Sequence, residues 1–245
     1  FVRNIGNCFC AHRFITFCSF VFQGAKIQIV KLLFMPIYKS IMVSAHTQVY
    51  LWKVTEAEKD LAKGIELTDP CHQRMQAMKS ELHRRAFLSI RHLLGKAGYE
   101  DKDLYYNDFG KPHLRDGNHV SITHSNHFTG IIIGRKEEVG IDIERQREKI
   151  LRIAHKFTPL HEYRTLANTE AIIRKLTVVW GAKESLYKIY GQPGLSFLKH
   201  IDVSDFTFDT SNTKAQIRYH GQQSEYHVDF LEFEGFTCVY AQREG

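Results

Sequence analysis

Residues 139–144, VGIDIE, constrain the fold more than any other stretch of the sequence, because apolar and acidic residues alternate there. This alternation is typical of a β-strand, on which successive side chains point to opposite faces. Asp142 and Glu144 should therefore share one face, with Ile141 and Ile143 packed behind them. Two neighbouring carboxylates repel each other, and oxygen ligands of this kind suit Mg²⁺. The alternative is an edge strand whose acidic face is simply solvated.

Periodicity predicts the remaining elements. A capping-box pattern of Thr55 and Glu58 predicts the start of a short helix. Apolar residues at three- and four-residue spacing predict a longer helix from Met75 to Leu93, ended by glycine. A second helical tract should run from Thr169 to Tyr190 and end at Gly191. Strands are expected over 38–54, 120–123, 129–133 and 139–143, and in the alternating tail after residue 206. This order suggests two α+β halves.

Charge and cysteine are concentrated at the start of the chain. The formal net charge is +6, but residues 1–34 contain four basic residues and no acid, which leaves +2 for the remainder. The same leader holds three of the five cysteines and no methionine, and Met35 follows it. We considered a targeting segment and translated sequence upstream of the true start, and we favour the second. The few remaining cysteines make a reducing cytoplasm the expected compartment.

Four further segments carry groups suited to chemistry, although each has an ordinary structural explanation. On a helix, Trp180, Glu184 and Lys188 would share one face, which could equally present a surface ion pair. The other three segments are a strand ending in Thr123 and His124, a turn at 110–112 (GKP), and basic residues on the first long helix. The basic residues, which could form a solvated face, are Arg84, Arg85 and Arg91.

The order of these segments resembles the 4′-phosphopantetheinyl transferase family, in its longer, pseudo-dimeric type typified by the surfactin-synthetase activator. The GKP turn, the THS strand end, the GIDIE strand, the segment 157–162 and the WxxKESxxK helix follow one another as in that family, over residues 79–199. The resemblance implies two similar halves related by a pseudo-twofold axis, each with a long helix packed on an antiparallel sheet. We expect a leader at 1–34, one half at 35–138 and a second half at 139–245 that carries the metal site.

The resemblance also implies roles for individual residues. Three acids match the positions that hold Mg²⁺ against the coenzyme A pyrophosphate: Asp142, Glu144 and Glu184. Lys188 matches a lysine that contacts the phosphates, and Glu184 is our candidate for the base. Residues matching the coenzyme site are Lys111, Pro112, Thr123 and His124, with Arg84 and Arg85 aligned approximately. Glu162 matches a glutamate of the intervening segment.

The implied reaction transfers 4′-phosphopantetheine from coenzyme A to a serine of an acyl or peptidyl carrier protein and releases adenosine 3′,5′-bisphosphate. We expect a cytoplasmic monomer that binds neither nucleic acid nor a membrane. One alternative is a Mg²⁺-dependent phosphohydrolase that uses the same acids with water as nucleophile. Another is a basic nucleic-acid-binding module, which is weakened because most of the excess charge lies in the leader. A zinc site is also conceivable from His113, His119, His124 and His127, although no familiar spacing completes it.

Overall fold

Alternating residues near the start of the described chain form an antiparallel hairpin of β1 (Lys39–Ser44) and β2 (Thr47–Lys53). Two later strands, β5 (His119–Ser125) and β6 (Phe128–Gly134), complete a four-stranded antiparallel sheet in the order β1-β2-β6-β5. The computed structural model describes residues 37–159 and 168–244, so the expectations for residues 1–34 and for Glu162 lie outside the described residues.

The second sheet is built from the C-terminal strands. Its order is β7-β11-β10-β9-β8, and each neighbouring pair is antiparallel. The strands are β7 (Val139–Arg145), β8 (Ile201–Val203), β9 (Asn212–Tyr219), β10 (Gln222–Phe233) and β11 (Phe236–Arg243). The expected α+β class is confirmed, whereas a pseudo-twofold relation between two halves stays a prediction.

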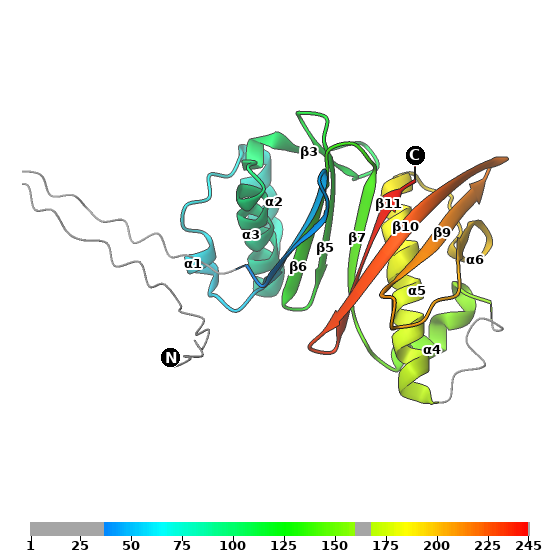
Figure 1. Ribbon diagram of the computed structural model, residues 1–245. Coiled ribbons are helices and arrows are strands. Elements are labelled where there is room, and N and C mark those ends of the chain that lie inside the picture. Colours follow the sequence, from blue (N-terminus) through cyan, green and yellow to red (C-terminus); the bar gives the residue numbers. More distant parts are fainter. Residues whose placement is uncertain (1–36, 160–167, 245) are drawn as a thin grey trace, which may run out of the picture. The chain divides into compact units, whose positions relative to one another are not determined.

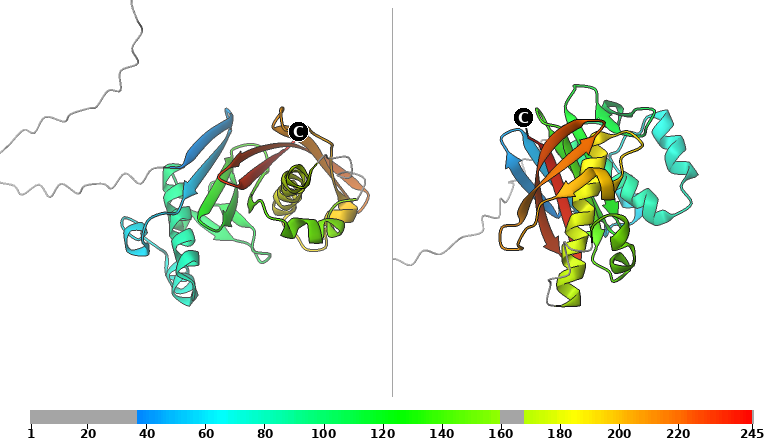
Figure 2. Two further views of the ribbon diagram at one scale, coloured as in Figure 1. Left: turned by 90° about the horizontal axis from the view of Figure 1, so that it is seen from below. Right: turned by 90° about the vertical axis from the view of Figure 1, so that its right-hand side faces the viewer.

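The two sheets pack against each other, and a long helix covers the outer side of each, within the compact unit Pro36–Gly245 (Figures 1 and 2). The helix α3 (Glu81–Lys96) lies on the first sheet, where the Ser89 hydroxyl is 2.8 Å from that of Thr129 on β6. The helix α5 (Thr169–Tyr190) lies on the second sheet. Apolar residues of β2, β6, β7 and β11 fill the core between the sheets.

The helix α5 matches the predicted bounds because both ends have strong local signals. The Asn168 side chain accepts a hydrogen bond from Ala171 N at 2.8 Å, which satisfies one of the unpaired amides of the first turn. Gly191 follows the last helical residue with a φ of 67°, a left-handed conformation that glycine adopts without a steric penalty. The sequence therefore fixes both ends of this helix.

The predicted single helix from Met75 to Leu93 is wrong. The chain forms α2 (Asp69–Ala77) and α3, separated by a break in which Met78 has a ψ of 113°. The Arg84 guanidinium stabilises the break, because it donates to the carbonyls of Met78 and Lys79 at 2.8 and 3.3 Å. Of these two helices, only α3 has buried residues. The apolar spacing that predicted one helix runs across both helices and the break between them.

The remaining elements are short. The helix α1 (Glu58–Leu61) has Ala57 at its N-cap and no side-chain cap, so the expected Thr55 and Glu58 capping box is not formed. A small ribbon joins β3 (Leu104–Tyr106) to β4 (Pro112–Leu114), with Lys111 in the turn between them. The other segments are α4 (Lys149–Ile153), α6 (Phe197–His200) and two 3₁₀ turns at Asp101–Asp103 and Ala154–Lys156.

Candidate active site

The strand β7 separates the apolar core from an acidic face, as the alternation of its residues predicts. Ile141 and Ile143 are fully buried in the core between the two sheets. Asp142 and Glu144 point the other way, and Asp142 is also buried, with 7% of its surface exposed. The solvated edge strand is therefore not what forms, because the acidic face of β7 is covered by α5.

Two glycines allow α5 to approach this acidic face closely. A Cβ atom on Gly140 of β7 would lie 2.0 Å from the carbonyl oxygen of Ser185, and one on Gly181 of α5 would lie 2.6 Å from Cγ2 of Val239. Both distances are far inside van der Waals contact, so larger residues would push the helix away from the sheet. The close packing brings the Glu184 and Lys188 side chains of α5 to the carboxylate of Asp142.

Asp142 has one oxygen with hydrogen-bond partners and one without. Lys188 Nζ donates to Asp142 Oδ1 at 2.8 Å and to the Ile141 carbonyl at 2.7 Å, and the Thr123 hydroxyl lies 3.3 Å from the same Oδ1. Asp142 Oδ2 is buried and has no hydrogen-bond partner among the described residues. A buried carboxylate oxygen without a partner is costly. Such an atom is a candidate ligand for a cation.

The electrostatics of the site couple the three acids. The pKa of Glu184 is raised from 4.5 to about 7, first by burial and then by the negative charge of Asp142, with a smaller contribution from Glu144. Burial and the charge of Asp142 also raise the pKa of Glu144. Lys188 opposes both shifts, and Arg147 opposes that of Glu144, but they do not cancel them. Three carboxylates therefore share a site in which each one makes it harder to ionise its neighbours.

The donor set fits a hard divalent cation. Within residues 37–159 and 168–244, no three His, Cys, Asp or Glu side chains are gathered tightly enough to hold a metal ion by themselves. Mg²⁺ does not require such a cage, since it usually keeps several waters and binds one or two carboxylates together with substrate phosphates. The free Asp142 Oδ2 and the three neighbouring carboxylates are the features that fit Mg²⁺.

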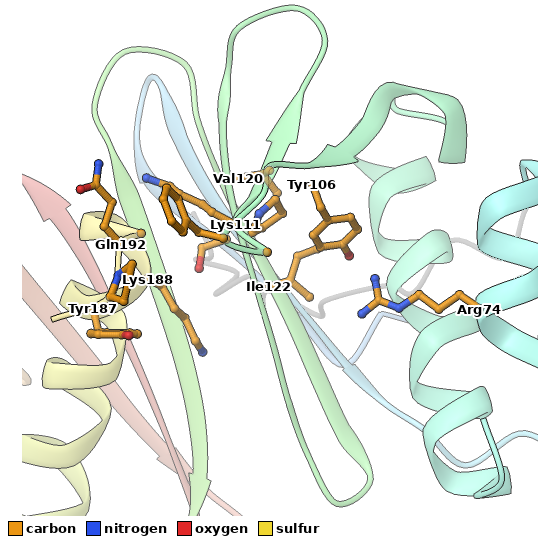
Figure 3. Close-up of a pocket in the computed structure, with 14 residues that line it drawn as sticks. Arg74, Tyr106, Lys111, Val120, Ile122, Tyr187, Lys188 and Gln192 are labelled. Atoms are coloured by element: carbon orange, nitrogen blue, oxygen red, sulfur yellow. The ribbon is translucent and has the colours of Figure 1, made fainter. Parts of the chain in front are cut away.

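A cavity of ≈ 450 Å³ opens beside this cluster (Figure 3). Lys188 and Tyr187 extend into it from α5, and Arg74 reaches it from α2 on the opposite side. Lys111 and Pro112 contribute the turn of the β3–β4 ribbon, and the start of β5 forms another wall. Three basic side chains therefore line one cavity, and one of them, Lys188, also contacts Asp142.

Lys111 joins the two sides of this cavity. Its ammonium group donates to the Ile189 carbonyl at 2.5 Å near the C-terminus of α5, where the helix dipole favours a cation. It also lies 3.9 Å from a Glu138 carboxylate oxygen. Burial lowers the pKa of Lys111, and the negative charge of Glu138 partly offsets that shift.

His124 lies at the end of β5, close to the acids but outside the cavity wall. Its ring makes an edge contact with the ring of His83 on α3, with centroids 6.1 Å apart. Removal of water from part of the ring lowers the pKa of His124, and the charges of His83 and Lys188 lower it further, while Asp142 raises it. His124 should thus be mostly neutral at pH 7.

The structure places Arg84 and Arg85 away from the cavity wall. Arg84 Nε lies 2.9 Å from each carboxylate oxygen of Glu58, and Arg85 donates to the Val54 carbonyl at 3.2 Å. Arg85 Nε is buried without a hydrogen-bond partner among the described residues. These arginines therefore hold α3 against neighbouring segments, and they are not brought together with Lys111 and Lys188.

Several cavity residues were missed by reasoning from the sequence. Arg74 stacks over the ring of Tyr106 at 5.0 Å, and Gln192 follows the end of α5. No motif distinguishes Arg74, because it lies in a helix without buried residues and meets Tyr106 only through the tertiary fold. Tyr187, by contrast, lies next to Lys188 inside the WxxKESxxK segment, so the motif could have indicated that Tyr187 belongs to the site.

The buried Lys183 of the same segment has a structural role. Its ammonium group donates to three carbonyl oxygens, those of Phe157, Phe197 and Ile201, at distances from 2.5 to 2.9 Å. These contacts attach α5 to the start of β8 and to the residues after α4. Lys183 therefore helps fix the helix that carries Glu184 and Lys188.

Comparison with known proteins supports the motif resemblance. Residues 138–241 match the family model of the 4′-phosphopantetheinyl transferase superfamily. The chain is 31% identical over 137 residues to the 4′-phosphopantetheinyl transferase gsp of Aneurinibacillus migulanus, a match that covers 54% of this chain and 54% of the relative. The chain thus matches about half the length of that curated relative. The matched residues 138–241 contain β7, α5 and the three acids, so the similarity to this superfamily covers the acidic half of the site.

Proposed function

We propose that this protein transfers the 4′-phosphopantetheine group of coenzyme A to a serine of an apo acyl or peptidyl carrier protein, releasing adenosine 3′,5′-bisphosphate. The observation that carries the proposal is that Lys188, which lines a cavity together with Arg74 and Lys111, also contacts Asp142 in a cluster of three buried or half-buried acids. That cluster lies in the segment that matches the superfamily. The relative is named as a 4′-phosphopantetheinyl transferase, that is, as an enzyme that transfers the same group.

The cavity would bind the coenzyme through its phosphates. Arg74, Lys111 and Lys188 line it, and each would contribute a positive charge to a pyrophosphate ligand. Pro112 fixes the backbone after Lys111, since its φ is restricted. His124 would contact the coenzyme as a neutral donor from the end of β5. Arg84 would reach the coenzyme only if its hydrogen bond to Glu58 broke, and Arg85 only if its hydrogen bond to the Val54 carbonyl broke.

Asp142, Glu144 and Glu184 would hold Mg²⁺ against the coenzyme pyrophosphate. When bound, this ion supplies Lewis-acid neutralisation of charge on the phosphoryl oxygens. The free Oδ2 of Asp142 is the residue atom best suited to contact it. Lys188, already at Asp142 Oδ1, would stabilise the charge that grows on the pyrophosphate as its bond breaks.

Glu184 would act as the general base. In the metal-free site the pKa of Glu184 is raised to about 7. A bound Mg²⁺ would lower this pKa, so that at physiological pH Glu184 would be the ionised carboxylate that a base requires. The carboxylate would accept the proton of the carrier serine as the serine oxygen forms a bond to the β-phosphorus of coenzyme A. The bond from that phosphorus to the bridging oxygen breaks, and the electron pair leaves with adenosine 3′,5′-bisphosphate.

We also propose that the protein is a monomer, acts in the cytoplasm and does not bind nucleic acid. Cys71 and Cys238, the two cysteines in the described part of the chain, are both free thiols, as a reducing compartment favours. Among the described residues, no helix is both long and apolar enough to cross a membrane.

Intact-mass spectrometry of an apo carrier protein tests the proposal. After incubation with this protein, coenzyme A and Mg²⁺, the carrier should gain the mass of one phosphopantetheine group. A phosphohydrolase would instead consume coenzyme A at the same rate with or without the carrier. Consumption of coenzyme A without a mass gain on any acyl or peptidyl carrier would contradict the transferase proposal and favour the hydrolase.

A further inference from the structure

The two sheets meet along strands that each lie at the edge of their own sheet, β5 and β7. An edge strand exposes main-chain groups that need hydrogen-bond partners once they are buried. Here side-chain hydroxyls of β5 provide them. Ser121 Oγ accepts from Ile141 N at 3.2 Å, and Thr123 Oγ1 accepts from Ile143 N at 3.0 Å. Two hydroxyls thus bridge the sheets on either side of Asp142.

Thr123 makes one contact that Ser121 does not. Its hydroxyl donates to Asp142 Oδ1 at 3.3 Å, a longer bond than the one from Lys188 to the same oxygen. A hydroxyl has one proton to donate, so this contact and the acceptance from Ile143 N use its donor and one lone pair. With 3% of its surface exposed, Thr123 has little access to a ligand from outside.

The orientation of the hydroxyl is restricted by packing. A Cβ atom on Gly130 of β6 would lie 3.3 Å from Thr123 Cγ2, so the threonine methyl fills the space beside that glycine. Threonine is β-branched, and a methyl group held in one place fixes the χ1 angle and the direction of the hydroxyl. Serine at this position would retain the hydroxyl but lack the methyl group.

We infer that Thr123 is a positioning residue that turns Asp142 so that Oδ1 is occupied by protein and Oδ2 is left for a cation, and not a coenzyme ligand. Thr123 does not line the cavity, although its neighbours Ser121 and Ile122 do. The inference rests on the proposed function, because it assigns Asp142 to a divalent cation. It revises the expectation that Thr123 lines the coenzyme site.

Binding of Mn²⁺, followed by electron paramagnetic resonance with coenzyme A present, measures this role without a carrier protein. Thr123→Val keeps the shape of the side chain and removes the hydroxyl. Loss of a partner that orients a metal ligand typically weakens metal binding ~10-fold to 100-fold, and we expect a loss in this range. Thr123→Ser should restore most of the affinity. At saturating Mg²⁺, the KM for coenzyme A of Thr123→Val should equal that of the wild type.

Ser121→Ala is the matched structural control, because it removes an equivalent bond between the sheets without touching Asp142. It should lower the melting temperature about as much as Thr123→Val. Because Ser121 lines the cavity, Mn²⁺ binding by all variants is compared at saturating coenzyme A, where Ser121→Ala should leave the Mn²⁺ affinity unchanged. If Thr123→Val does not fold, Thr123→Ala removes the same hydroxyl without adding bulk and carries the same expectation.

Two results would overturn the inference. A raised KM for coenzyme A with unchanged Mn²⁺ affinity would make Thr123 a coenzyme ligand. Equal losses of Mn²⁺ affinity in Ser121→Ala and the Thr123 variants would show a general structural effect. A wild-type protein that binds Mn²⁺ but loads no carrier would contradict the proposed function alone, since the Mn²⁺ titration needs no carrier.

Discussion

Replacing Glu184 with glutamine should stabilise the metal-free protein, and the gain should depend on pH. The glutamine keeps the shape of the side chain and cannot ionise. In the wild type, burial and the charge of Asp142 raise the pKa of Glu184 from 4.5 to about 7, so ionisation of this group opposes folding. A shift of this size corresponds to ~3 kcal/mol, and solvent screening of a partly accessible group reduces the expected gain to ~1 to 2 kcal/mol.

The direction of the pH dependence follows from the raised pKa. Below the unfolded pKa of about 4.5, Glu184 is protonated in both states, so the wild type and Glu184→Gln should be equally stable. Between this value and about 7, the folded protein retains a proton that the unfolded chain has lost, and the stability of the wild type falls as pH rises. Above about 7 the full difference between the two proteins should be present.

Urea unfolding in the presence of a chelator, repeated at several pH values, measures this difference directly. The chelator removes divalent ions, which would otherwise bind the wild type more tightly than the variant. A free-energy gap that opens between acid pH and pH 8 would support the electrostatic account of the site. A gap that is constant with pH, or a variant less stable than the wild type at pH 8, would refute it.

Three further expectations concern the cavity and its surroundings. Lys111→Ala and His124→Ala should mainly raise the KM for coenzyme A, because their contacts would exist in the ground state as well as the transition state; a large fall in kcat with unchanged KM would contradict this. Arg84→Ala should lower the melting temperature without changing that KM, because Arg84 binds Glu58 and the carbonyls before α3; a raised KM would return Arg84 to the coenzyme site. Arg74→Gln should raise the KM for coenzyme A, as steady-state kinetics would show, and an unchanged KM would remove Arg74 from the phosphate-binding set.

The acidic half of the site could be predicted from the sequence because its information is local. Alternation along β7 determines which face Asp142 and Glu144 share, and helical spacing places Glu184 and Lys188 on one face of α5. The ends of α5 were also predictable, since Asn168 and Gly191 provide standard capping signals. In each case residues a few positions apart carry the whole argument.

The rest of the site depends on contacts between distant segments. The break between α2 and α3 is stabilised by Arg84, whose partner Glu58 lies 26 residues earlier. The bond from Lys111 to the Ile189 carbonyl spans 78 residues. No periodicity or motif specifies such pairs. Thr123 illustrates the same limit, because its position beside Asp142 follows from the meeting of two sheet edges.

The central claim is that the Asp142 cluster supports phosphopantetheine transfer, and the rate of carrier loading by Asp142→Asn tests it most directly. Asp209→Asn, an exposed aspartate in the segment between β8 and β9, is the matched control. With coenzyme A and Mg²⁺ at saturating concentrations, Asp142→Asn should leave the carrier in its apo mass while the control loads it as fast as the wild type. Circular dichroism should show that both variants are folded. Loading by a folded Asp142→Asn protein at the wild-type rate would contradict the account.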